Sequence, residues 1–327
     1  MKTKRWVRTG ATVVVTSAAI AYIVSKVDLG QTAHILGSAS VPWLVLMVVL
    51  TIVTVPPTAL RWKWLLRARG VHENVPWLTR AYFVSYAVGQ VLPTSVGGDA
   101  SRIFETSRRH PGQITPITGS VLLERAIGGA VTLLLAGTGM LLAIHRYPIG
   151  PYYWVEAIFI AGTIFAGFVF FSKRVRTWLR FALPWARKLR AEPAARAVYD
   201  GLHGYRDHPA TLVWVALVTL GAQILRVLAI YASGRAVGID LPLLPYVVLG
   251  PLLFLVMLIP FTINGLGVRE AFFVSFLGKL GVPHDPAFAC GFLFFISTIL
   301  LALPGLAILL WENLFGRRRA PIANGTT

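Results

Sequence analysis

The sequence predicts an all-α fold, a polytopic bundle of transmembrane helices, and three observations support this prediction. Of the 327 residues, 56% are hydrophobic and 13% are charged, and the mean hydropathy of +0.67 leaves too little polar surface for a water-soluble globule. The apolar residues gather in runs of about 20, the length that crosses a hydrocarbon core. The 31 Lys and Arg residues, against 13 Asp and Glu, lie in short segments between these runs. That pattern indicates orientation in a bilayer and excludes a basic face for nucleic acid.

Six runs have the length and composition of full spans, at roughly 10–25, 41–60, 118–144, 152–172, 210–232 and 287–311. The first is short and follows basic residues, so a cleaved signal peptide and an uncleaved anchor are both open; the missing small-residue cleavage site favours the anchor. Two further apolar regions, 81–96 and 243–280, are interrupted by glycine, proline and charge. We therefore expect about six full spans and two broken helical regions.

The basic residues predict on which side each connection lies. Clusters precede the first span, follow the second span and follow the region 81–96. Since cations concentrate in cytoplasmic loops, the N-terminus is expected in the cytoplasm, and 81–96 is expected to enter and return on that side as a re-entrant hairpin. The segment 173–206 is the most basic, and three arginines at 317–319 follow the last span, so this loop and the C-terminus are also predicted to be cytoplasmic. The region 243–280 then forms a second hairpin from the opposite face.

Two structures remain open for the loop 173–206, whose aromatic residues recur at roughly helical spacing. One is an interfacial helix that binds anionic lipid, and the other is a basic connector with aromatic side chains at the headgroup level. Pro184 interrupts any single long helix, so the connector is favoured.

The chain is predicted to form one membrane domain, 1–327, that contains an inverted repeat. Residues 41–145 and 210–311 each contain a span, a hairpin and a span, in opposite orientations, and the basic loop 173–209 precedes the second half. The hairpins are locally similar, with LPTSVGGDASR at 92–102 and IPFTINGLGVRE at 259–270. Inverted repeats whose broken helices meet near the midplane are typical of transporters.

Polar residues inside the apolar regions are the candidate substrate-binding residues. A buried charge costs roughly 2.5 to 3.5 kcal/mol to insert, so it normally faces a protein interior or a wet cavity. The candidates are Asp99, Arg102, Glu124, Arg125, Arg226, Asn264, Arg269 and Glu270. Neighbouring helical residues point about 100° apart, so Glu124 and Arg125 are expected to find partners on other segments. We expect Glu124 to pair with Arg226, and a scaffold role and a transport role for this pair remain equally open.

Glycines mark the point where each hairpin breaks, and they permit a tightly turned or left-handed backbone there. They are Gly97, Gly98, Gly265 and Gly267. A half-helix that begins after them points free N–H groups and a positive dipole end inward. With Arg102 and Arg269 added, each hairpin is a candidate phosphate site. Asp99 is either a helix N-cap or a functional carboxylate. Glu270 is either a counter-ion for Arg269 or a proton-coupling group.

Motifs for catalysis are missing from the sequence. There is no GxxxxGK[ST] nucleotide loop, no HExxH and no CxxC, and all seven histidines lie in predicted loops or at membrane edges. The single cysteine, Cys290, allows no internal disulfide. We therefore predict no catalytic residue, no metal and no cofactor, and a transporter in preference to an enzyme.

The segments RWKWLLRARG (61–70), YAVGQVLPTSVGGDASRIFE (86–105), LLERAIGG (122–129) and LIPFTINGLGVREAFF (258–273) occur in this order before a final span. This arrangement resembles the flippase-like family known as the lysylphosphatidylglycerol synthase transmembrane region, over nearly the whole chain. In two-domain members of that family, the membrane part moves an aminoacylated phospholipid between leaflets, and a separate cytosolic domain synthesises it. The chain ends at Thr327, soon after the last span, so the resemblance implies a stand-alone translocator without synthase activity. The charged motif positions are Asp99, Arg102, Glu124, Arg125, Arg269 and Glu270.

The sequence thus predicts a multi-pass protein of the cell membrane, with both termini cytoplasmic, that translocates a lipid downhill or by ion coupling. The lipid is an anionic or aminoacylated phospholipid or a polyprenyl-phosphate-linked lipid, with Arg102 and Arg269 holding its phosphate. One rival is a non-transporting scaffold for a glycosyltransferase or lipid-modifying enzyme. The other is a membrane-embedded transferase, for which Asp99 and Glu105 are the candidate metal-binding pair.

Overall fold

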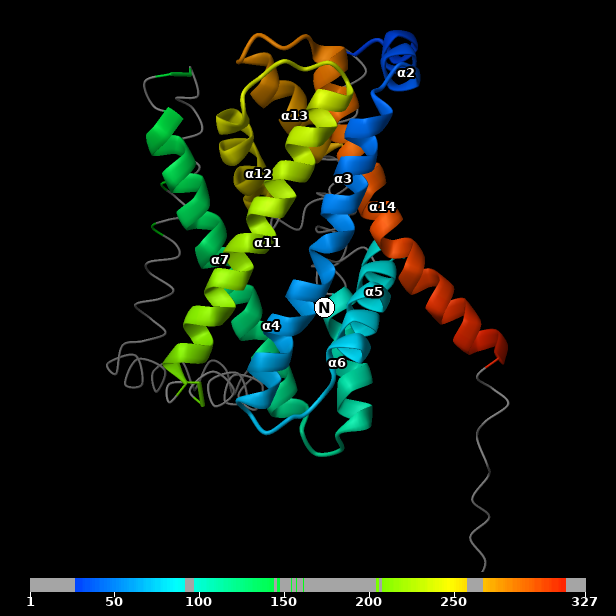
Figure 1. Ribbon diagram of the computed structural model, residues 1–327, viewed down its shortest axis with the longest axis vertical. Helices are drawn as coiled ribbons and strands as arrows, with labels where there is room; N and C mark the ends of the chain where they lie inside the picture. Colours follow the sequence, from blue (N-terminus) through cyan, green and yellow to red (C-terminus); the bar gives the residue numbers. More distant parts are fainter. Residues whose placement is uncertain are drawn as a thin grey trace, which may run out of the picture.

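The computed structural model describes residues 27–91, 97–143, 146–147, 154, 157, 161, 204–205, 208–257 and 267–315. Every regular element in this part of the chain is an α-helix, and the helices pack side by side as a bundle (Figure 1). The predicted fold class, an all-α membrane bundle, is confirmed.

Four of the predicted spans lie in the described residues, and each is a helical segment long and apolar enough to cross a membrane. They are Val41–Arg67, Ile114–Ala143, Pro209–Ala236 and His284–Glu312. The predicted span 10–25 lies outside the described residues, as do 152–172 apart from isolated positions and nearly all of the basic loop 173–206.

The first span consists of two consecutive helices, α3 (Val41–Val53) and α4 (Val55–Arg67). Pro56 and Pro57 stand in the first turn of α4, where their missing N–H groups are tolerated but interrupt the preceding helix. The other spans are α7 (Ile114–Ala143), α11 (Pro209–Ala236) and α14 (His284–Phe315). A short helix that the sequence did not predict, α2 (Leu29–Gly37), precedes α3 and is capped by the Asp28 carboxylate, which accepts the Gly30 N–H at 2.8 Å.

Both interrupted regions form pairs of helices. The first pair is α5 (Val75–Val91) and α6 (Gly97–Arg109), and the second is α12 (Leu243–Met257) and α13 (Val268–Gly278). α5 begins before the predicted residue 81, because the Asn74 carboxamide accepts the Trp77 N–H at 2.8 Å and starts the helix there. α6 and α13 begin at the glycines, as predicted. The turns 92–96 and 258–266 lie outside the described residues.

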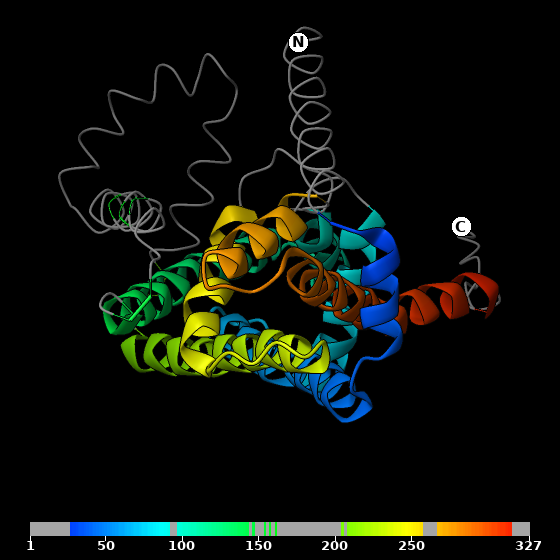
Figure 2. The ribbon, with the colours of Figure 1, turned by 90° about the horizontal axis from the view of Figure 1, so that it is seen from above.

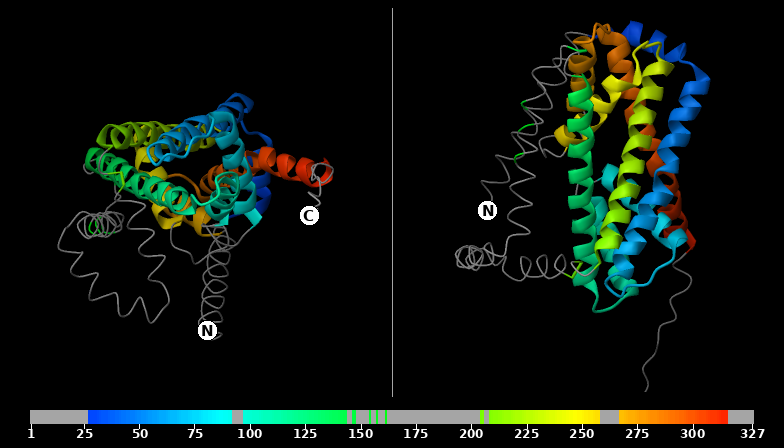
Figure 3. Two further views of the ribbon diagram at one scale, coloured as in Figure 1. Left: turned by 90° about the horizontal axis from the view of Figure 1, so that it is seen from below. Right: turned by 60° about the vertical axis from the view of Figure 1, so that its left-hand side comes forward.

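The two helix pairs lie in opposite halves of the bundle. Figure 1 shows α12 and α13 in the upper half and α5 and α6 in the lower half, and the side view in Figure 3 agrees. α5 packs along α14, and α12 packs along α7. The first helix of each pair therefore contacts the last span of the other half. An inverted repeat requires such a pattern, and the repeat itself stays a prediction.

α11 connects the two halves. It contacts α3, α4, α7, α12 and α14, and seen from above it runs along one side of the bundle (Figure 2). Two main apolar cores lie beside it: one contains Leu249 and Phe273 of the second helix pair, and the other contains Trp62 and Tyr82 of α4 and α5. The candidate site described below borders this second core.

Glycine permits the closest crossings between the halves. A Cβ atom on Gly305 of α14 would overlap the carbonyl oxygen of Phe83 on α5, and one on Gly139 of α7 would lie 3.1 Å from the carbonyl oxygen of Val247 on α12. Close backbone approach at small residues is a main source of helix association in membranes.

Gly305→Ala is expected to destabilise the protein by about 1–3 kcal/mol, because the added methyl group meets rigid backbone and cannot rotate away. The loss is measured as a lowered apparent Tm in detergent. Gly221→Ala is the matched control: Gly221 is exposed on α11, and a Cβ there meets no atom within 4 Å. Equal melting of the Gly305→Ala variant and the wild type would show that α5 and α14 do not cross this closely.

Candidate functional site

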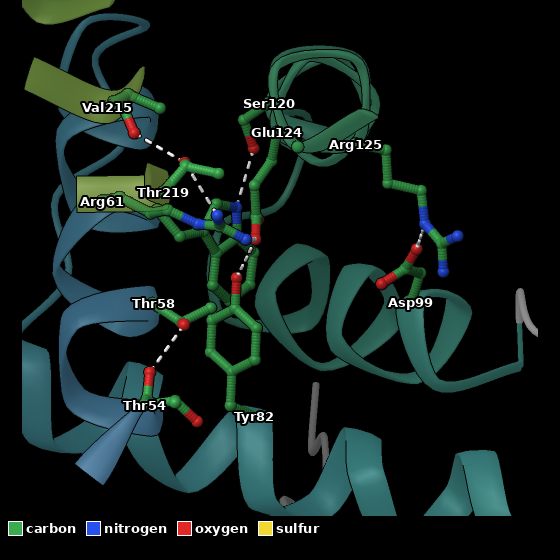
Figure 4. Close-up of polar contacts among 12 residues, drawn as sticks. Thr54, Thr58, Arg61, Tyr82, Asp99, Ser120, Glu124, Arg125, Val215 and Thr219 are labelled. Atoms are coloured by element: carbon green, nitrogen blue, oxygen red, sulfur yellow. Dashed lines mark hydrogen bonds and ion pairs between the residues drawn. The ribbon is translucent and has the colours of Figure 1, made fainter. Parts of the chain in front are cut away.

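Glu124 of α7 is 3% exposed and lies at the centre of a buried charged network (Figure 4). Its Oε1 accepts hydrogen bonds from Arg61 Nη2 of α4 and from the Tyr82 hydroxyl of α5, each at 2.5 Å. Its Oε2 accepts from Arg102 Nη1 of α6 at 2.7 Å. Arg102 also donates to the Tyr82 hydroxyl at 2.6 Å. One carboxylate therefore joins four helices.

Aromatic rings and hydroxyls hold the arginines of this network in place. The Arg102 guanidinium lies 4.7 Å from the ring centroid of Trp62 and 4.6 Å from that of Tyr82, within the range of cation–π attraction. Trp62 is fixed in turn, because its Nε1 donates to Ser120 Oγ at 2.9 Å. Arg61 Nη1 donates to Thr219 Oγ1 of α11 at 2.8 Å, which extends the network to a fifth helix.

Asp99 joins the network from the first turn of α6. Its Oδ1 accepts from Arg102 Nε at 3.1 Å, and its Oδ2 forms an ion pair with Arg125 of α7. Asp99 is the third residue of α6, so the alternative that it is the N-cap of this helix is wrong. Its carboxylate instead forms ion pairs with both Arg102 and Arg125, at the positive end of the helix dipole. Glu124 and Arg125 bind partners on other helices, as their 100° separation predicts.

The expected pairing of Glu124 with Arg226 is wrong. The carboxylate faces α4 and α6, whereas Arg226 on α11 donates to Gln223 Oε1 at 3.4 Å and lies 5.5 Å from the ring centroid of Phe254 on α12. Sequence reasoning missed Arg61, because the span was predicted to end at residue 60 and Arg61 was counted in the basic loop. α4 continues to Arg67, and the apolar residues Ala59, Trp62 and Leu66, which recur at helical spacing around Arg61, are the sequence signal that could have extended the span.

The network borders a cavity of about 370 Å³. Its charged lining residues are Arg61, Asp99, Arg102, Glu124, Arg125 and Arg226, and its uncharged lining residues are Thr58, Tyr82, Ser85, Tyr86, Gly128, Gly129, Thr132, Gln223, Phe254, Leu255 and Met257. The start of α6 and the end of α12 both line it, so the cavity lies where the two helix pairs are interrupted. Four arginines and two carboxylates give the described lining a formal charge of +2.

Arg269 and Glu270 form a separate pair on α13, and neither is among the described residues that line the cavity. Both are buried; Arg269 Nη2 donates to Glu270 Oε1 at 2.7 Å, and its guanidinium lies 4.4 Å from the Phe295 ring centroid. Glu270 Oε2 accepts the Gly267 N–H at 2.8 Å, so the start of α13 already holds an anion. Arg269 thus already has an anionic partner, and Glu270 has the geometry of a counter-ion; that Arg102 and Arg269 hold the phosphate stays a prediction.

The hairpin glycines have two different physical roles. Gly267 has a φ of 81°, the left-handed conformation that was expected. Gly98 has no positive φ; a Cβ there would lie 2.5 Å from the Ser85 carbonyl oxygen, so this glycine permits close packing of α5 against α6. Gly97 is buried at the start of α6. Gly265 and Asn264 lie outside the described residues.

Asp99 and Glu105, the candidate metal-binding pair, have different arginine partners. Glu105 forms an ion pair with Arg80 at 3.2 Å, and neither residue is among the described residues that line the cavity. Among the described residues, no group of three or more His, Cys, Asp or Glu side chains has an arrangement that could hold a metal ion. The site therefore consists of arginines, carboxylates and neutral donors.

A family model described as "Lysylphosphatidylglycerol synthase TM region" matches residues 10–305, which include both helix pairs and the cavity. No curated protein matches the chain. The family resemblance that the sequence motifs indicated is confirmed.

Glu124→Gln is expected to destabilise the protein by about 3–5 kcal/mol, because it leaves Arg61 without a carboxylate partner and buried Arg102 with Asp99 alone. The apparent Tm in detergent measures the loss. Glu105→Gln is the matched control, since its ion pair with Arg80 is partly exposed and contributes about 0–1 kcal/mol. If Arg226 were the partner of Glu124 after all, Arg226→Gln would lower the Tm as much as Glu124→Gln does.

Proposed function

Because the chain belongs to the lysylphosphatidylglycerol synthase transmembrane-region family, we propose that it translocates a phosphate-bearing lipid between the leaflets of the cell membrane. The observation that carries the proposal is the charged cavity at the point where both helix pairs are interrupted. The chain is a multi-pass helical membrane protein of a lipid-related family, and this cavity lies between its helices. The chain acts as a transporter, and no catalytic residue is assigned to it.

The energetics of buried charge support a role for the cavity beyond holding helices together. Six charged side chains surround it, and each is costly at membrane depth even when it is paired. Apolar side chains of similar volume often stabilise a bundle equally well or better. Charges that are kept around a cavity are typical of substrate pathways.

The size of the cavity supports passage of a headgroup alone. A volume of about 370 Å³ is at the lower end of small-molecule sites, far below the volume of a whole phospholipid with its two chains. The headgroup would cross through the polar cavity while the acyl chains remain in the surrounding hydrocarbon. Exposed apolar side chains on the spans, such as Leu134, Leu141 and Trp214, offer an outer surface compatible with acyl chains.

The arrangement of the helix pairs supports access from alternating sides. If α5–α6 is a re-entrant hairpin from the cytoplasm and α12–α13 one from the opposite face, the two ends that line the cavity lead to different sides of the membrane. A small displacement of either pair then opens the cavity to one side. Since the sequence has no nucleotide-binding loop, movement is downhill or ion-coupled.

Asp99→Asn is expected to slow leaflet exchange of fluorescent phosphate-bearing lipids in reconstituted liposomes by about tenfold or more, since bonds between charged groups contribute about 1.5–3 kcal/mol each. The substitution removes the charge that positions Arg102 and Arg125. Asp240→Asn is the matched control, because Asp240 also pairs with an arginine, Arg235, but is exposed and away from the cavity.

Two outcomes would contradict the proposal. Wild-type exchange by folded Asp99→Asn protein would remove the cavity from the pathway. No exchange of any lipid by folded wild-type protein would favour the scaffold for a glycosyltransferase or lipid-modifying enzyme, and that partner should then co-purify with the chain.

The proposed orientation can be tested with single cysteines. Ser38, after α2, and His72, after α4, are exposed, and Figure 1 places these two connections at opposite ends of the first span. With the N-terminus in the cytoplasm, Ser38→Cys is expected to react with a membrane-impermeant maleimide from outside, and His72→Cys only after permeabilisation. Native Cys290 is buried and gives little background. The reverse labelling pattern would overturn the orientation.

A further inference from the structure

The cavity contains two kinds of arginine, which differ in whether a carboxylate already binds them. Glu124 binds Arg61 and Arg102, and Asp99 binds Arg102 and Arg125. Three of the four lining arginines therefore already have an anionic partner. An incoming anion would have to displace a carboxylate to bind any of them fully.

Arg226 is the exception among the described lining residues. It is half-buried on α11, and no carboxylate of the described chain lies within ion-pair distance of it. Its interactions are a long hydrogen bond of 3.4 Å to Gln223 Oε1 and a cation–π contact with Phe254. Both are weaker than the charge-assisted bond that a phosphate oxygen would make.

Gln223 sets the position of Arg226. It is buried, and its Nε2 donates to Thr132 Oγ1 of α7, so its carbonyl oxygen is the end directed toward Arg226. This bond fixes the orientation of the amide between α7 and α11. A phosphate that binds Arg226 needs only to replace one long bond to a neutral oxygen.

The two carboxylates of the cavity, unlike Arg226, already have partners of opposite charge. Asp99 and Glu124 each bind two arginines, and Glu124 also accepts from Tyr82. No described lining residue is a carboxylate without an arginine, and the hairpin turns 92–96 and 258–266 contain no charged residue in the sequence. A cationic amine that entered would meet, among the described lining residues, a formal charge of +2 and only carboxylates that already bind arginines.

We propose that the cavity selects lipids whose headgroup is a phosphate with net negative charge, bound through Arg226, and discriminates against headgroups that carry a cationic amine. This inference rests on the proposed function and names its substrate class. It favours anionic phospholipids and lipid monophosphates over zwitterionic and aminoacylated phospholipids. Gln223 is the residue that positions the binding cation.

Leaflet exchange is measured in liposomes with fluorescent phosphatidylglycerol, phosphatidylcholine and lysyl-phosphatidylglycerol that share their acyl chains. The wild type is expected to exchange phosphatidylglycerol about tenfold faster than the other two, because all three carry a phosphodiester but the cationic groups of the other two meet a lining of formal charge +2. Arg226→Gln is expected to remove most of that preference, since it takes away the one positive charge that no described carboxylate balances. Arg226→Lys should retain part of the preference, since it keeps the charge and loses the planar fork. Arg235→Gln is the matched control on the same helix, as Arg235 pairs with Asp240 outside the cavity.

A binding measurement in detergent separates this inference from the proposed function. Thermal stabilisation is recorded with short-chain phosphatidylglycerol, short-chain phosphatidylcholine and inorganic phosphate. Stabilisation by phosphatidylglycerol that is lost in Arg226→Gln supports the anion site, even if no lipid exchanges. Equal stabilisation by both lipids, or stabilisation that survives Arg226→Gln, overturns the inference and leaves the proposed translocation standing if exchange occurs. Stabilisation by inorganic phosphate alone would identify a free anion, in place of a lipid, as the ligand and would also overturn it.

Discussion

The ion pairs of Glu124 are the interaction on which the rest of the site depends. One carboxylate receives hydrogen bonds from α4, α5 and α6 while it belongs to α7, so it fixes the first helix pair against two spans. Arg102 is buried and the Arg61 side chain is only 11% exposed, so both charges are costly at membrane depth and the carboxylate offsets much of that cost. The same bonds keep Arg61 and Arg102 occupied. Glu124 thereby holds two of the four cavity arginines, and Arg226 is the one that no described carboxylate binds.

The two halves of the bundle differ in their chemistry although they share an order of helices. In the second half, Arg269 and Glu270 form an ion pair with each other, and Glu270 also caps α13. Both charges are therefore paired within a single helix. In the first half, the charges of α6 extend to α4 and α7 and reach an open cavity. The second helix pair contributes apolar residues there, with Phe254 and Met257 at the end of α12. The shared order of helices thus does not produce two equivalent sites.

Composition and charge distribution were sufficient to predict the fold class and the four described spans, because hydrophobic length and loop charge are local properties of the sequence. The starts of α6 and α13 were also predictable, since a proline followed within a few residues by two glycines marks a break in an apolar run, whereas single glycines such as Gly139 and Gly305 lie inside helices. The partners of Glu124 were not predictable from the sequence. Which side chains face Glu124 depends on how far each helix is rotated about its axis, and that rotation is set by packing. Arg61 was missed for a related reason: hydropathy falls at residue 60, but the helix continues to Arg67.

The glycine crossings at Gly305 and Gly139 have a mechanical consequence. At each of them two helices touch through backbone atoms, with no side chain from the glycine interlocked between them. Helices in such contact can slide or rotate with little repacking, which is the basis of shear motion. Each crossing also joins a helix pair to the opposite half, since α5 meets α14 and α12 meets α7. Each helix pair can therefore shift along the opposite span by small sliding steps, without the side-chain repacking that a larger residue at Gly139 or Gly305 would impose.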